Sequence, residues 1–235
     1  MMILPGIEGE SILNRDIALG LDEGGVSAAI EVYDWTIGVP GAFVPNLAFL
    51  DRNKRQAAEL ARRIVEYRED HPGAPVFLIG HSAGGGVVVL TLEALPAGRQ
   101  IDMAILLAPA LSPDYDLSTA LRRTRRGITS FFSSLDVGFL RVGTIIFGAV
   151  DRKHGSAAGA VGFVPPEELS AEDRELYGRK LRQVRWTQRL RRVGASGLHI
   201  GWASQDFARE YLAPLILRSG AARATTGTHP AADSP

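Results

Sequence analysis

The residues best suited to chemistry in this sequence are Ser82 and the glycines around it, in the stretch G-H-S-A-G from Gly80 to Gly84. The four apolar residues 76–79 come before it and are typical of a buried parallel strand. Residues 87–90 follow at a spacing that a helix can use. A serine flanked by glycines at minus two and plus two, between strand and helix, matches a nucleophile elbow, whose strained turn presents the hydroxyl beside a helix N-terminus. The alternative is a glycine-rich turn or phosphate site without a nucleophile.

A serine hydroxyl needs a general base within hydrogen-bond reach, because its own pKa lies far above neutrality. The histidines that could supply one are His71, His81, His154, His199 and His229. His81 adjoins Ser82, but a sharp turn points neighbouring side chains apart, so we expect it to pack inside the elbow. His71 lies in a helix-stop turn, and His229 lies in the C-terminal tail. The residues themselves leave His154, in R-K-H-G-S, and His199, in G-L-H-I-G, as candidate bases.

The base in turn needs a buried carboxylate that fixes its tautomer. The candidates are Asp114, Asp116, Asp136 and Asp151. The segment S-P-D-Y-D-L-S around Asp114 and Asp116 is typical of an exposed turn and helix cap. Asp136 lies in an apolar setting, after Phe131 and Phe132, where a carboxylate requires a partner. Asp136 is therefore the leading candidate, with a helix N-cap as its alternative role.

Composition excludes several other classes of function. The chain has 235 residues, 46% of them hydrophobic and 22% charged, which suits a single globular domain. It contains no cysteine, so disulfides, thiol catalysis and cysteine metal sites are excluded, and this fits a cytoplasmic protein. A net charge of zero gives no reason to expect nucleic acid or an anionic membrane as partner. No apolar run is long enough to cross a bilayer, and the first residues lack the pattern of a signal peptide.

The elements that must position these residues alternate along the chain. We predict strands at residues 2–4, 28–35, 76–79, 101–108, 127–135 and 184–187. The clearest helix covers residues 50–70 and ends at Pro72-Gly73. Such alternation predicts an α/β fold, a mostly parallel sheet of about six strands with helices on both faces. We expect one catalytic domain over residues 1–218 and a disordered tail over 219–235.

The combination of elbow, alternating elements and an early glycine loop resembles the α/β-hydrolase superfamily, over about residues 1–218. The G-H-S-x-G form is common in its esterases and lipases. The sequence departs from that pattern in two ways. The first two antiparallel edge strands of the family are missing, and Pro5-Gly6 stands where the family carries a histidine–glycine pair.

The resemblance implies roles for individual residues. It implies that Ser82 is the nucleophile and that His199, between the last strand and last helix, is the base. It implies Asp136 as the acid, although Asp114 and Asp116 occupy a position used in some lipases. The implied activity is hydrolysis of a small-molecule carboxylic ester, without cofactor or metal.

The resemblance also implies an oxyanion hole formed by the backbone N–H groups of Ile7 and Ala83. Thioesterase, acyltransferase and peptidase activities share the fold, and a non-catalytic ligand-binding module is a further alternative. Residues 137–163 lie between the acid and the base, where they either line an acyl pocket or belong to the core. The ester, its chain length and the oligomeric state are open at this point.

Overall fold

The computed structural model describes residues 1–37, 50–136 and 157–224, which form one six-stranded sheet. Its strands are β1 (Met2–Leu4), β2 (Glu31–Val32), β3 (Phe77–His81), β4 (Met103–Leu107), β5 (Ile128–Phe132) and β6 (Leu181–Arg185). The order across the sheet is β2-β1-β3-β4-β5-β6, and all these pairs are parallel. The predicted fold class is confirmed, and the described strands include no antiparallel edge pair.

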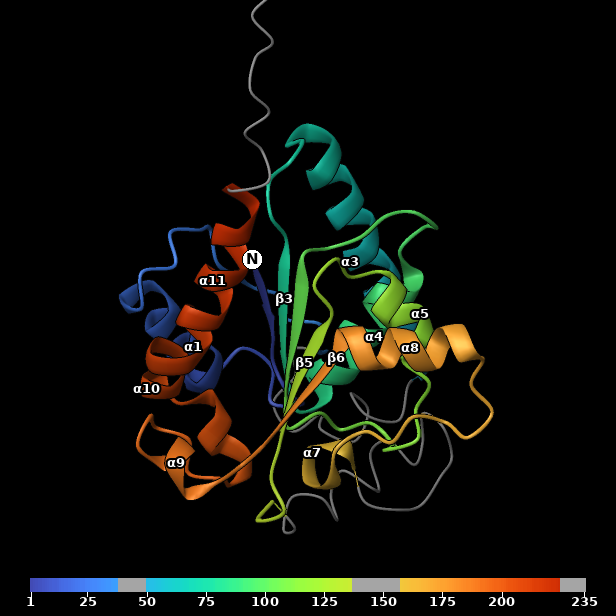
Figure 1. Cartoon of the computed structure of the whole chain (residues 1–235). Coiled ribbons are helices and arrows are strands. Elements are labelled where there is room, and N and C mark those ends of the chain that lie inside the picture. Colours follow the sequence, from blue (N-terminus) through green and yellow to red (C-terminus); the bar gives the residue numbers. More distant parts are fainter. Residues whose placement is uncertain (38–49, 137–156, 225–235) are drawn as a thin grey trace, which may run out of the picture.

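Helices cover both faces of the sheet (Figure 1). One face carries α1 (Ile12–Glu23), α9 (Gln188–Arg191), η1 (His199–Ala203), α10 (Gln205–Phe207), η2 (Ala208–Leu212) and α11 (Ala213–Ala224). The other face carries α3 (Leu50–Asp70), α4 (Ala83–Ala94), α5 (Ser118–Arg122) and α8 (Ala171–Lys180). Successive residues of a strand point to opposite faces. Ile3 and Leu4 of β1 therefore enter different cores, one on each side of the sheet.

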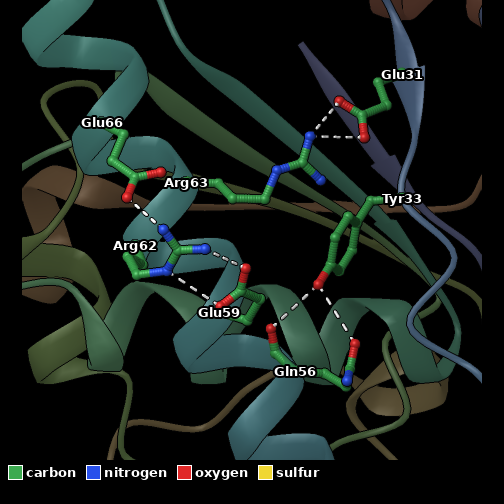
Figure 2. A network of polar contacts seen from close by, with 7 residues as sticks. All are labelled: Glu31, Tyr33, Gln56, Glu59, Arg62, Arg63 and Glu66. Carbon is green, nitrogen blue, oxygen red and sulfur yellow. Dashed lines mark hydrogen bonds and ion pairs between the residues drawn. The ribbon is translucent and has the colours of Figure 1, made fainter.

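Sequence pattern explains the central elements. Strands β3 and β4 are buried along their whole length, which accounts for their continuous apolar runs. Helix α3 begins and ends at the predicted residues, and its buried stripe includes the predicted Ala57, Leu60, Ala61 and Ile64. Its outer side is charged. There, Arg63 bonds Glu31 of β2 at 3.0 Å, and Arg62 bridges Glu59 and Glu66 (Figure 2). Exposed pairs of this kind contribute little to stability.

The edge strands differ from the predictions. Strand β2 has two residues where residues 28–35 were predicted, and β6 begins at Leu181 rather than at 184. Both have mostly exposed or half-buried residues, so they lack the apolar run that marks a central strand. Helix α11 continues to Ala224, beyond the domain end predicted at 218.

Some predicted features lie outside the described residues. These are most of the predicted tail and residues 137–156, which include Asp151 and His154. The described end of the 137–163 segment contains α7 (Ala158–Val161). The amide of Ala158 donates to the Leu111 carbonyl at 2.7 Å, and Val161 is exposed.

Candidate active site

Ser82 occupies a strained turn between β3 and α4. Its backbone has φ 53° and ψ −120°, a region that non-glycine residues rarely adopt. The flanking glycines are required by close packing. A Cβ on Gly84 would lie 2.2 Å from the Leu4 carbonyl oxygen, and one on Gly80 would lie 2.5 Å from the Gly84 oxygen. The strand, turn and helix predicted around this serine are all present.

Hydrogen bonds to both neighbouring segments hold the turn in place. The Ser82 amide donates to the Leu107 carbonyl of β4 at 2.9 Å, and the Ser82 carbonyl accepts from Gly85 and Ala110 at 3.0 and 3.1 Å. Amides in the first turn of a helix have no acceptor within that helix. The buried N-terminus of α4, which starts at Ala83, therefore offers N–H groups and a positive dipole end beside Ser82.

His199 and Asp136 are in direct contact. Nδ1 of His199 lies 2.7 Å from Oδ2 of Asp136, and the two side chains are 11% and 1% exposed. A carboxylate oxygen accepts hydrogen bonds, so Nδ1 carries the hydrogen and Nε2 is the nitrogen able to take up a proton. Asp136 follows β5, and His199 is the first residue of η1. The structure thus brings together the predicted base and the leading candidate acid, 63 residues apart in sequence.

The alternative acids have other surroundings. Asp114 and Asp116 lie exposed on a turn, as their local sequence predicts. The Asp116 carboxylate accepts hydrogen bonds from the Ser118 amide at 2.8 Å and from the Tyr177 hydroxyl at 3.2 Å. Partial burial opposes ionisation of Asp116, but these hydrogen bonds outweigh it and lower its pKa below the ordinary value.

The loop after β1 packs directly on the elbow. A Cβ on Gly84 would also meet the Pro5 carbonyl oxygen at 2.3 Å, so the two segments touch through their backbones. The indole nitrogen of Trp35 donates to that same carbonyl at 2.8 Å and fixes the loop. Ile7 and Ala83, whose amides we expect to form an oxyanion hole, therefore belong to adjoining segments.

Two polar residues of this region were not predicted to take part. Nε2 of His81 lies 3.1 Å from the His199 carbonyl oxygen, whereas the sequence suggested only packing for His81. The Glu8 carboxylate accepts from the Gly6 amide at 3.2 Å. Desolvation raises the pKa of Glu8, while its hydrogen bonds and the nearby His199 act in the opposite direction. The only sequence signal for Glu8 was an acidic residue inside the P-G-I-E-G loop.

The described residues show no cluster of three or more histidine, aspartate or glutamate side chains that could hold a metal ion. Within the same residues, no helix combines the length and the apolar character needed to cross a membrane.

Comparison with known proteins places the chain in a family. Residues 47–196 match the family model described as serine aminopeptidase, S33, a match that includes Ser82 and Asp136 and ends just before His199. No curated protein matches the sequence.

Similar solved structures include esterases. Est1E from Butyrivibrio proteoclasticus is 12% identical, with a TM-score of 0.50 over 94% of this chain and 87% of that one. Its complex with ferulic acid gives 13% identity and a TM-score of 0.51 over 94% and 88%. An esterase domain from Rhodothermus marinus gives 13% and 0.47 over 92% and 85%. At such identities the likeness shows the fold alone. Because the family model covers more than half of the sequence, this chain belongs to the serine aminopeptidase S33 family of α/β-hydrolase enzymes.

Proposed function

We propose that this protein is a serine hydrolase that cleaves carboxylic esters through an acyl-enzyme on Ser82. The observation that carries the proposal is the 2.7 Å contact between His199 Nδ1 and Asp136 Oδ2. Asp136 follows the carboxyl end of β5, and the strained elbow presents Ser82 just beyond the carboxyl end of β3. The contact and the serine therefore belong to the same edge of the sheet. A histidine paired with a buried carboxylate beside an elbow serine is the arrangement that nucleophilic acyl transfer needs.

In the proposed mechanism, Ser82 Oγ attacks the ester carbonyl while His199 Nε2 takes the serine proton. The Ile7 and Ala83 amides stabilise the resulting oxyanion, and such donors are typically worth ~3–4 kcal/mol each. His199 then returns the proton to the departing alcohol, which leaves the acyl group on Ser82. Water, deprotonated by His199, releases the acid and regenerates the serine. Asp136 holds the tautomer and stabilises the imidazolium in both halves of the reaction.

Apolar side chains near the candidate site favour an ester with an apolar acyl group. Leu198 and Ile200 flank His199 and are 55% and 53% exposed, and Leu135 precedes Asp136 and is 50% exposed. These side chains adjoin the acid and the base in sequence, and exposed apolar residues beside a site can contact a ligand.

Aminopeptidase activity is the second candidate. The family is described by that activity. A free amine at the substrate N-terminus needs an anionic partner, and Glu8 offers a carboxyl group whose pKa the nearby His199 acts to lower. Loss of aminoacyl-nitroanilide cleavage in Glu8→Gln, with ester turnover retained, would favour this candidate.

Labelling with a fluorophosphonate probe tests the proposal, together with nitrophenyl esters of increasing acyl length. We expect Ser82→Ala to abolish labelling and to lower ester turnover by ~10⁴-fold or more. Ser134→Ala is the matched control, because Ser134 lies near Asp136 in sequence but outside the elbow. This control should label like the parent. Labelling that survives Ser82→Ala would refute the assignment.

A further inference from the structure

His81 is a buried histidine that the mechanism above does not use. It is the last residue of β3, directly before Ser82, and only 2% exposed. Its Nε2 lies 3.1 Å from the carbonyl oxygen of His199, and the two imidazole rings are 5.0 Å apart between centroids. A carbonyl can only accept, so the hydrogen of His81 must be on Nε2.

The geometry points to His81 as a positioning residue, which holds the backbone of the catalytic base through a hydrogen bond from Nε2–H to the His199 carbonyl. This inference rests on the proposed role of His199 as base. It goes beyond that role, because it assigns a function to the residue that precedes the nucleophile.

The surroundings of His81 keep this donor in one state. Burial and, to a smaller extent, the nearby His199 lower the pKa of His81 to about 3, against a smaller opposing effect of the hydrogen bond. The ring is therefore neutral at ordinary working pH, with one hydrogen that the contact places on Nε2. Its Nδ1 is buried and has no hydrogen-bond partner among the described residues. A neutral anchor also adds no positive charge beside the imidazolium that forms on His199 during the reaction.

The segment that carries His199 needs such an anchor. His199 starts a short 3₁₀ helix after a loop that contains Gly197 at φ 85°. Asp136 holds the His199 ring through Nδ1, and His81 holds the His199 backbone through its carbonyl oxygen. Because Ser82 and His81 are consecutive, strand β3 then fixes both the nucleophile and the backbone of the base. Any drift of His199 along the loop would change its distance from Ser82, and small misplacements of a catalytic group are costly.

Two substitutions separate positioning from packing. His81→Leu fills the space without a donor, whereas His81→Gln places an amide N–H near the position of Nε2. We expect His81→Leu to lower kcat for a nitrophenyl ester by roughly 10- to 100-fold with KM changed little, and His81→Gln to recover most of the loss. Thermal unfolding of each variant reports its stability. Parent-like kcat in His81→Leu, or equal losses in both variants that follow their loss of stability, would overturn the inference.

Nitrogen NMR of histidine-labelled parent protein gives a test that does not depend on how the variants fold. The expected spectrum shows His81, assigned by its absence in His81→Gln, as a neutral ring protonated on Nε2 between about pH 5 and 8. A ring protonated on Nδ1, or one that titrates in this range, would refute the inference. A parent without Ser82-dependent turnover would instead refute the proposed function. The two failures are therefore distinguishable.

Discussion

A buried aspartate lies at each end of the parallel strands, one at their amino ends (the amino edge of the sheet) and one at their carboxyl ends (the carboxyl edge). The partners of these two aspartates differ. Asp102, directly before β4, has a side chain that is 2% exposed. It accepts from the Arg68 guanidinium at 2.6 Å and from the Val76 amide at 2.9 Å. Asp136, after β5, has a side chain that is 1% exposed and lies 2.7 Å from His199. The two carboxylates are thus equally buried, one at the amino edge and one at the carboxyl edge of the parallel strands.

The difference in partner decides what each carboxylate can do. Arginine is always charged, so the contact between Asp102 and Arg68 is static and ties α3 to the sheet. An imidazole can accept and return a proton during a reaction, so a contact between a carboxylate and a histidine suits the proposed role of His199 as base. Burial alone therefore does not mark a catalytic carboxylate. The proposed catalytic role of Asp136 rests instead on its contact with a histidine on the side of the elbow serine.

The largest expected effect comes from removing the charge at the carboxyl edge. Asp136→Asn should lower kcat for ester hydrolysis by at least roughly a hundredfold, because an amide no longer stabilises the imidazolium or fixes its tautomer. Steady-state kinetics on a nitrophenyl ester measure this. Asp114→Asn, on the exposed turn, is the control and should stay within a few-fold of the parent, as should Asp116→Asn. If Asp114→Asn were the inactive enzyme and Asp136→Asn were active, the acid would lie on the other strand.

The same substitution at the amino edge should act on stability instead. Asp102→Asn leaves the charge of Arg68 buried without its carboxylate, so the free energy of unfolding should fall by about 3 kcal/mol. Urea denaturation measures the loss, and kcat of the folded variant should remain within a few-fold of the parent. The control is Glu69→Gln, because Glu69 and Arg99 form an exposed pair. Its removal should cost at most about 1 kcal/mol. A large loss of kcat in folded Asp102→Asn would contradict the contrast between the two edges.

Local pattern was enough to predict the central elements and the elbow. Residues 76–84 combine an apolar run with glycines at two fixed positions, and the structure shows backbone contacts that exclude a side chain at both. Helix α3 has an apolar stripe and a Pro-Gly stop, so its bounds could be read directly. The edge strands β2 and β6 were predicted with the wrong bounds, because their exposed residues give no apolar run.

Contacts between distant segments could not be predicted. Asp102 stands inside the run I-D-M-A-I-L-L, which indicated a buried strand but gave no sign of Arg68, 34 residues earlier. The contact of His81 with the His199 carbonyl joins residues 118 apart. The contact between His199 and Asp136 agrees with the residues that the family resemblance suggested, while their catalytic roles remain predictions.

A third carboxylate, the half-buried Glu93 of α4, extends the comparison and gives the smallest expected effect. Its partner is a neutral hydroxyl, because Tyr115 donates to Glu93 at 3.1 Å. The pKa of Glu93 is raised from 4.5 to about 7, mainly because partial burial disfavours the charged form; Asp116 contributes to the rise, while Tyr115 and Lys54 oppose it. At a pH between these two pKa values, Glu93 holds a proton in the folded protein that it has lost in the unfolded chain. Stability should therefore fall as pH rises through this window.

Glu93→Gln replaces the carboxyl by a neutral group of the same shape, so it should abolish this part of the pH dependence. We expect the variant to exceed the parent in unfolding free energy by about 1 kcal/mol or more at pH 8, an advantage that shrinks towards pH 4.5. Urea denaturation at pH 5 and pH 8 measures it. Glu172→Gln, on the exposed surface of α8, is the control and should differ from the parent by the same small amount at both pH values. An advantage of Glu93→Gln that did not change with pH would show that Glu93 does not titrate in this window. In that case the neutral hydroxyl partner of Glu93 would not give it a pH dependence different from that of Asp102 and Asp136.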